Sequence, residues 1–199
     1  LTLLLFMSTS PALAQQCTPP SDLSDPWRLQ SKSLADLADA PGEPQLVQQE
    51  VSTPTAGSRG ELEVTAEMHA LFAVDLAAFE EAIRDVEGQS DYLPRLTDSE
   101  VLCADGDPSS YVLVQQELSF KFLFFGRDYE YVLHYFMESS EPRSFRVWWV
   151  LDEPLDRDIL TTDGSWYFEE VRVDGEVYTY MAYVTHTVFR NERFGLRTA

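Results

Sequence analysis

Basic residues are scarce in this sequence of 199 residues. It has 14 Lys and Arg residues against 34 Asp and Glu residues, so its formal net charge is -20. Such a field repels phosphate backbones and anionic lipid headgroups, and no Lys/Arg cluster is present to release counterions from a nucleic acid. The composition therefore argues against nucleic acid as a partner.

Residue types that bind metals or act as catalytic nucleophiles are also few. The three histidines, His69, His134 and His186, are far apart in the sequence and lack the His/Cys/Asp spacing of a metal site. The sequence has no Gly-x-Ser-x-Gly segment, no glycine-rich phosphate loop and no Cys-x-x-Cys pair. We therefore predict no metal site, no cofactor and no catalytic residue.

Cysteine occurs only twice, at Cys17 and Cys103. An oxidising compartment would allow the two thiols to form a disulfide. Cys17 lies in a segment of turn-forming composition, however, and two unpaired thiols are an equal alternative. The sequence leaves both open.

Long apolar runs are missing as well. The run "LTLLLFM" is shorter than the roughly 20 apolar residues that a membrane-spanning helix needs. Followed by "PALAQQ", with Ala12 and Ala14 before a cleavage point, it is typical of a signal peptide. We expect residues 1–14 to be cleaved after Ala14 and the protein to be secreted or periplasmic, with a retained anchor as the weaker alternative. No Met or basic segment precedes Leu1, so we expect the sequence to be truncated at its start.

The segment that follows is rich in turn-forming residues. Residues 15–44 contain several Pro, Ser and Asp residues and one marginal helical stretch, "SLADLADA". We interpret this segment as a flexible leader before a single domain that covers residues 45–199.

Hydrophobic residues make up 44% of the sequence and aromatic residues 13%, as in folded globular domains. The segments "PQLVQQEVS" and "ELEVTAEMHA" alternate like strands. In "VDLAAFEEAIRDVEG" the apolar residues recur every three or four positions and Asp75 stands at an N-cap position, which predicts a helix.

From residue 97 onward the sequence predicts strands. Six segments rich in β-branched and aromatic residues are separated by short turn sequences, and Asp174-Gly175 is typical of a two-residue hairpin turn. This order of elements predicts an α+β fold, in which a curved antiparallel β-sheet packs against a helix that follows the first strands. The segment "SFKFLFFGRDYEYVLHYFM" is apolar on both faces, which favours a sheet that encloses a pocket over an open sheet.

Three motifs, in this order, resemble the START-like (helix-grip, SRPBCC) superfamily. They are "DYLPRLTDSEVL", "YVLVQQELSFKFLFFGRDYEYVL" and "GSWYFEEV" followed by a hairpin and "YMAYVTHTVF". The resemblance implies a hydrophobic cavity on the concave side of the sheet, closed by a long C-terminal helix. The chain ends in "RNERFGLRTA", so we expect that helix to be missing and the domain to be truncated there.

The resemblance leads to three hypotheses about function. The first is binding or transport of a lipid or another hydrophobic small molecule in the cavity. The second is a polyketide cyclase/dehydrase-like enzyme, with His134 or His186 as the best acid–base candidate. The third is an interaction module whose interior is fully packed.

Candidate ligand-binding residues follow from the alternation of strand residues. Trp149 shares a face with Phe145, Val147 and Leu151, so we place it inside, although plain core packing is an equal interpretation. We leave open which face of the last strand points inward. The full set of candidates is Tyr131, Phe145, Val147, Trp149, Trp166 and Tyr183. For Arg127 and Asp128, at the tip of the aromatic hairpin, we favour a structural ion pair over ligand contact.

Overall fold

A computed structural model of the chain describes residues 15–23, 34–52, 61–106, 108–122, 125–140, 143–155 and 158–190. Within these ranges, residues 15–16, 120–122, 125–127 and 154 are described by their backbone alone. The predicted signal peptide, residues 1–14, lies outside the described residues.

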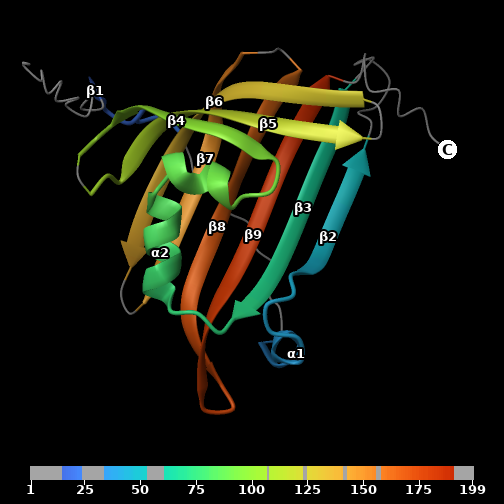
Figure 1. The fold of residues 1–199 in the computed structure, drawn as a ribbon, viewed down its shortest axis with the longest axis vertical. Coiled ribbons are helices and arrows are strands. Elements are labelled where there is room, and N and C mark those ends of the chain that lie inside the picture. The colour runs from blue at the N-terminus through green and yellow to red at the C-terminus, as the bar shows by residue number, and fades with distance from the viewer. Residues whose placement is uncertain are drawn as a thin grey trace, which may run out of the picture.

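The described residues form one large sheet with a few short helices (Figure 1). The helical segments are α1 (Leu34–Ala38), α2 (Leu76–Arg84) and the 3-10 helix η1 (Glu87–Asp91). The strands are β1 (Gln15–Gln16), β2 (Gln45–Ser52), β3 (Glu61–Phe72), β4 (Leu96–Ala104), β5 (Tyr111–Phe122), β6 (Phe125–Ser140), β7 (Ser144–Pro154), β8 (Ile159–Val173) and β9 (Glu176–Arg190). Their order in the sheet is β1-β4-β5-β6-β7-β8-β9-β3-β2.

The strands from β4 to β9 form an antiparallel meander, as the sequence predicts. The first long strand, β3, pairs with the last, β9, so the two ends of the fold meet inside the sheet. The hairpin between β8 and β9 turns at Asp174 and Gly175, whose φ angles of 52° and 89° match the expected two-residue turn. The α+β fold predicted from the sequence is confirmed.

The sheet is strongly curved. Register shifts interrupt the β4–β5, β6–β7 and β8–β9 ladders, and such bulges bend a strand and increase its twist. Figure 1 shows β5 and β6 passing across the front of the sheet on the same side as α2. The sheet therefore has a concave face, which we call the inner face, and an opposite outer face.

Helix α2 packs on the inner face at one end of the sheet. Its apolar side chains Leu76, Phe79 and Ile83 recur at helical spacing and join the main hydrophobic core. Phe79 stacks on Phe168 of β8 with ring centroids 5.2 Å apart. Asp75 precedes the helix in an extended conformation but makes no side-chain cap hydrogen bond, so the predicted N-cap interaction is not formed.

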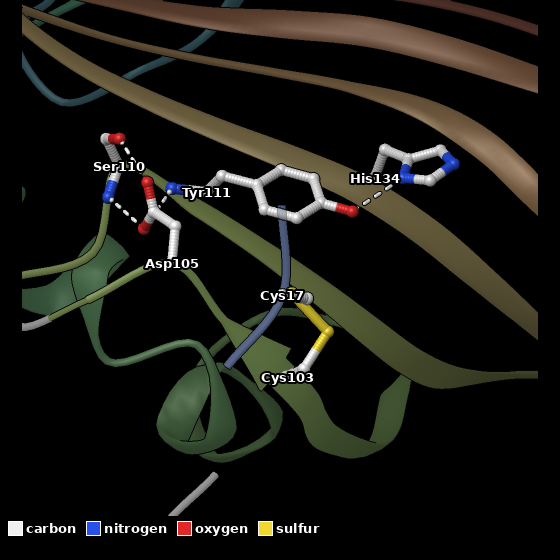
Figure 2. Close-up of a disulfide and its surroundings, with 6 residues drawn as sticks. All are labelled: Cys17, Cys103, Asp105, Ser110, Tyr111 and His134. Carbon is white, nitrogen blue, oxygen red and sulfur yellow. Dashed lines mark hydrogen bonds between the residues drawn. A yellow bond between two sulfur atoms is a disulfide. The ribbon is translucent and has the colours of Figure 1, made fainter. Parts of the chain in front are cut away.

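The leader contains two ordered elements despite its turn-rich composition. Strand β1 pairs in parallel with the end of β4, and Cys17, directly after β1, forms a disulfide with Cys103 (Figure 2). Of the two alternatives for the cysteines, the disulfide is the one present. Helix α1 contacts β3 and β8, two strands inside the sheet, and its Leu37 is fully buried. Two attachments therefore hold the leader to the sheet.

Next to the disulfide, a carboxylate orders the connection from β4 to β5 (Figure 2). Asp105 accepts hydrogen bonds from the Ser110 amide (2.9 Å), the Ser110 hydroxyl (2.6 Å) and the Tyr111 amide (3.0 Å). Burial raises the pKa of Asp105, but these hydrogen bonds outweigh it and leave the pKa below its usual range. The ionised carboxylate thus fixes the start of β5.

Candidate functional site

A glycine in β8 allows the central side chain of the site to lie flat on the sheet. Gly164 is the direct register partner of Trp149 on β7. A Cβ atom built on Gly164 would stand 2.8 Å from Cε2 of the indole, closer still to Cζ2, and 2.5 Å from the carbonyl oxygen of Val184. The indole thus occupies the space that any other residue at position 164 would fill.

Because it lies over β8, Trp149 reaches a side chain two strands away. Its ring centroid is 5.9 Å from that of Tyr183 on β9 and 5.7 Å from that of Trp166 on β8. Trp166 and Tyr183 are themselves 6.0 Å apart. We call Trp149, Trp166 and Tyr183 the aromatic cluster; all three are among the candidates predicted from the sequence.

The other predicted residues divide between two places. Phe145 and Val147 are fully buried at the end of the inner face where α2 packs, and the Arg84 guanidinium lies 5.0 Å from the ring centroid of Phe145. Their surroundings are those of core residues. Tyr131 of β6 is buried on the inner face, opposite Gln116 of β5. The aromatic cluster and Tyr131 therefore form the centre of the candidate site.

The odd-numbered residues of β9 point inward, which the sequence left open. Met181, Tyr183 and Phe189 pack against the hydrophobic core, as Trp149 does. The placement of Trp149 inside, inferred from alternation, is therefore confirmed, whereas its predicted contact with a ligand stays a prediction.

Burial keeps the inner tyrosines protonated. It raises the pKa of Tyr131, Tyr135 and Tyr183, and for Tyr131 and Tyr135 the nearby Tyr183 hydroxyl adds to this effect. Hydrogen bonds to Tyr135 from Gln89 and to Tyr183 from Thr185 work in the opposite direction without reversing it. The hydroxyls therefore remain neutral at physiological pH.

A buried polar network borders the aromatic side chains. The Gln89 amide donates to the Ile83 carbonyl (2.9 Å) and to the Tyr135 hydroxyl (3.1 Å). The Gln116 amide donates to Gln89 Oε1 (3.4 Å) and to Ser99 Oγ (3.3 Å). Sequence reasoning missed this network, because η1, β4 and β5 contribute single polar residues and only the folded sheet brings them together.

Part of the inner face is less buried than the core around it. Trp166, Tyr183 and Met181 are half-buried, whereas Trp149, Tyr131 and Phe168 are buried. On β3 the inward residues Ala66 and Met68, register partners of Thr185 and Tyr183, are also half-buried. Among the described residues, α2 covers only the Phe145 and Phe168 end, so accessible apolar and aromatic surface remains along β3, β8 and β9.

All three histidines lie on the outer face, and each ring is hydrogen-bonded through both nitrogens. His69 contacts Glu67 (2.7 Å) and Tyr180 (2.5 Å), and it is completely buried. His134 contacts Tyr111 and Asp152, both at 2.9 Å, and His186 contacts Asp163 and Glu63, both at 3.0 Å. His134 and His186 therefore cannot act as the acid or base of a cyclase on the inner face.

His186 differs from the other two histidines because it is held between two carboxylates. Burial lowers its pKa, but the hydrogen bonds and charges of Asp163 and Glu63 outweigh burial and leave the pKa raised. The contacts join β3, β9 and β8 across the outer face, which gives His186 a structural role.

The predicted Arg127–Asp128 ion pair stays a prediction. In β6 the backbone of Arg127 pairs with Phe120 and that of Asp128 with Ser119. The Asp128 side chain is exposed, and the Arg127 side chain is not among those that the structure describes.

Other kinds of site find little support in the part of the chain that the structure describes. It contains no group of three His, Cys, Asp or Glu side chains placed to hold a metal ion. It also contains no helix with the length and apolar character needed to cross a membrane. A depression of about 590 Å³ lies along α2 and η1, lined by Ala78, Glu81, Ala82, Asp85, Gly88, Asp91 and Tyr92. None of the candidate ligand-binding residues borders it.

Comparisons with solved structures give proteins of similar fold. A STAR-related lipid transfer protein from Xanthomonas axonopodis is 15% identical over 70% of this chain and 81% of that chain, with a TM-score of 0.49. The Zhui aromatase/cyclase from Streptomyces sp. R1128 is 16% identical over 64% and 69%, with a TM-score of 0.49. A START superfamily protein from Mycobacterium smegmatis is 10% identical over 65% and 79%, with a TM-score of 0.47.

No protein-family model matches the sequence, and neither does any curated protein. The START-like resemblance noted in the sequence holds for the fold, because the described topology is that of a helix-grip sheet: a helix after the first long strands, then an antiparallel meander that returns to β3. The fold alone does not determine the function.

Proposed function

We propose that the protein binds a hydrophobic small molecule, such as a lipid, on the inner face of its curved sheet. The observation that carries the proposal is the incomplete burial of Trp166 and Tyr183 beside buried Trp149. Trp and Tyr are seldom buried completely, so the position of the exposed part matters more than its size. Here accessible aromatic surface lies on the concave face, and small-molecule sites usually have an apolar and aromatic lining.

The polar groups nearby support the same proposal. Ligand sites combine an apolar lining with a few polar groups that orient the ligand. The Tyr131 and Tyr183 hydroxyls and the Gln89–Gln116 network are such groups. Carriage of the ligand outside the cytoplasm is the finer form of the proposal, and the Cys17–Cys103 disulfide is compatible with an oxidising compartment.

A pair of adjacent substitutions tests the proposal. Thr185 points to the inner face between Ala66 and Gly164, and Val184 points to the outer face; both are half-buried. The neutral fluorescent probe N-phenylnaphthylamine should bind the natural protein with a rise in emission. Thr185→Trp should abolish this rise by filling the inner face, whereas Val184→Trp should leave it unchanged. Equal binding by both variants, or no binding by the natural protein, would contradict the proposal.

Lipid extract provides a second readout. Protein incubated with a total lipid extract and purified again should carry a recurrent small molecule, detectable by mass spectrometry. Thr185→Trp should lose this molecule and Val184→Trp should retain it. Recovery of the natural protein without any bound molecule would favour the alternative of a packed interaction module.

A further inference from the structure

The inner face carries aromatic, apolar and neutral polar side chains around the aromatic cluster. The register of β3, β7, β8 and β9 gives the inner-face residues around the aromatic cluster, and none of them is charged: Ala66, Met68, Val147, Trp149, Gly164, Trp166, Tyr183 and Thr185. Nearby polar groups include tyrosine hydroxyls, the Thr185 and Ser99 hydroxyls, and the Gln89 and Gln116 amides. We infer that the ligand is uncharged where it contacts the aromatic cluster, as in an alcohol, a ketone or a phenol; the inference rests on the proposed function.

The physical reason is the cost of burying an unpaired charge. A carboxylate or ammonium group taken out of water loses several kcal/mol of hydration unless an opposite charge and hydrogen bonds replace it. A hydroxyl or carbonyl group needs only a hydrogen bond, which a tyrosine or glutamine can supply. The neutral polar groups beside the aromatic cluster suit the second kind of ligand.

Arg84 is a cation near the inner face, but it is already engaged. Its Nε donates to Glu80 (2.9 Å), and its two terminal nitrogens donate to the Ser109 carbonyl (2.9 Å) and to the Ser139 hydroxyl (3.0 Å). It lies over Phe145, four residues before Trp149 on β7, which is about 13 Å along a strand. It is therefore poorly placed to pair with an anion at the aromatic cluster.

Arg127 is a second cation to consider. Arg127 precedes Tyr131 by four residues on β6, which is again about 13 Å along the strand. An anionic ligand would have to extend to this end of β6 to meet it. The net charge of -20 also opposes the approach of anions to the protein as a whole.

The tyrosines preserve the neutral character of the face. Burial raises the pKa of Tyr131 and Tyr183, so neither hydroxyl ionises in the physiological range. Both therefore remain available as hydrogen-bond donors, and neither supplies a charge that would attract an organic cation.

Three ligands of equal chain length test the inference: decanol, decanoate and decylamine, each competing with N-phenylnaphthylamine at pH 7.5 and moderate salt. Decanol should displace the probe at a concentration at least about tenfold lower than either charged ligand, equivalent to about 1.4 kcal/mol. Decanoate or decylamine competing as well as decanol would overturn the inference while the proposed function stands. Failure of the probe itself to bind would overturn the proposed function, and with it the inference.

Three substitutions separate the causes. Thr185→Lys places a cation on the inner face and should raise the affinity for decanoate by about tenfold or more, the scale of one charge-assisted hydrogen bond. Val184→Lys adds the same charge to the outer face and should leave the affinity for decanoate unchanged. An equal gain in decanoate affinity in both variants would contradict the inference. Arg127→Gln should not alter decanoate competition; if it abolishes tight decanoate binding, an anion site at Arg127 replaces the neutral site.

Discussion

The indole of Trp149 lies over the backbone of Gly164, its register partner on the neighbouring strand. This contact lets a side chain from β7 cross β8 and stack near Tyr183 of β9. The geometry of the aromatic cluster therefore depends on glycine at position 164, because a side chain there would displace the indole.

Gly164→Ala should lower the free energy of unfolding by about 1–3 kcal/mol, the usual cost of overpacking a core. The new methyl group would meet both the indole and the Val184 carbonyl, and backbone atoms cannot move aside easily. Urea unfolding measures the change. Gly106→Ala is the matched control, because a Cβ atom there would meet nothing within 4 Å. Equal stability of the two variants would contradict the contact.

The disulfide should make a large contribution to stability. It closes a loop with a sequence separation of 86, and removal of a disulfide commonly costs about 2–4 kcal/mol through the entropy of the unfolded chain. Cys17→Ser/Cys103→Ser should therefore unfold at clearly lower urea concentration than the oxidised protein. Thiol titration of the unfolded, unreduced protein should detect no free thiol; two reactive thiols would show that the pair does not form.

The stability of the fold should depend on the protonation of His186. Its pKa in the folded protein is raised above the ordinary 6.5, so the folded state binds the proton more tightly than the unfolded state. The stabilisation is fully present below about pH 6.5 and is lost as the pH rises through the folded-state value. The difference in unfolding free energy between the natural protein and His186→Gln should therefore be larger at pH 5.5 than at pH 9.

NMR titration of the imidazole checks the cause. Asp163→Asn removes one of the two carboxylates that contact His186 and should lower its pKa. A pKa for His186 at or below 6.5 in the natural protein would contradict this account.

The buried pair of Glu67 and His69 should be sensitive to the loss of one partner. Both side chains are almost fully inaccessible, and His69 Nε2 lies 2.7 Å from Glu67 Oε1. Removing one partner of a buried hydrogen bond typically costs about 1–3 kcal/mol, because the buried polar atom that remains, here His69 Nε2, is left unsatisfied. Glu67→Ala should destabilise the protein by this amount in urea unfolding. Glu63→Ala, which removes a partly exposed carboxylate from the same strand, should cost much less; equal losses would show that burial is not decisive.

Much of the architecture could be predicted because the strand pattern is strong. The alternation of Leu62, Val64, Ala66 and Met68 and the Asp174-Gly175 turn both reappear in the structure. The start of β8 was harder to predict. The segment "TTDG" has the composition of a turn, yet it lies within the strand, where Gly164 accommodates the Trp149 indole. The local turn propensity of this segment therefore did not determine its structure.

The candidate site was only partly predictable for a similar reason. Alternation correctly grouped Trp149 with Phe145 and Val147 on one face, but it could not tell which part of that face α2 would cover. The Gln89 and Gln116 side chains come from different elements, and their hydrogen bond depends on long-range pairing. No local pattern in the sequence could have indicated it.

The methionine methyl groups offer the most direct test of ligand binding on the inner face. Met68 and Met181 are half-buried there, next to Tyr183 in the register, whereas Met137 is fully buried in the core. In protein labelled with carbon-13 at the methionine methyls, decanol should shift the Met68 and Met181 signals and leave the Met137 signal nearly unchanged. Saturating decanol that moves neither the Met68 nor the Met181 signal would contradict the central claim.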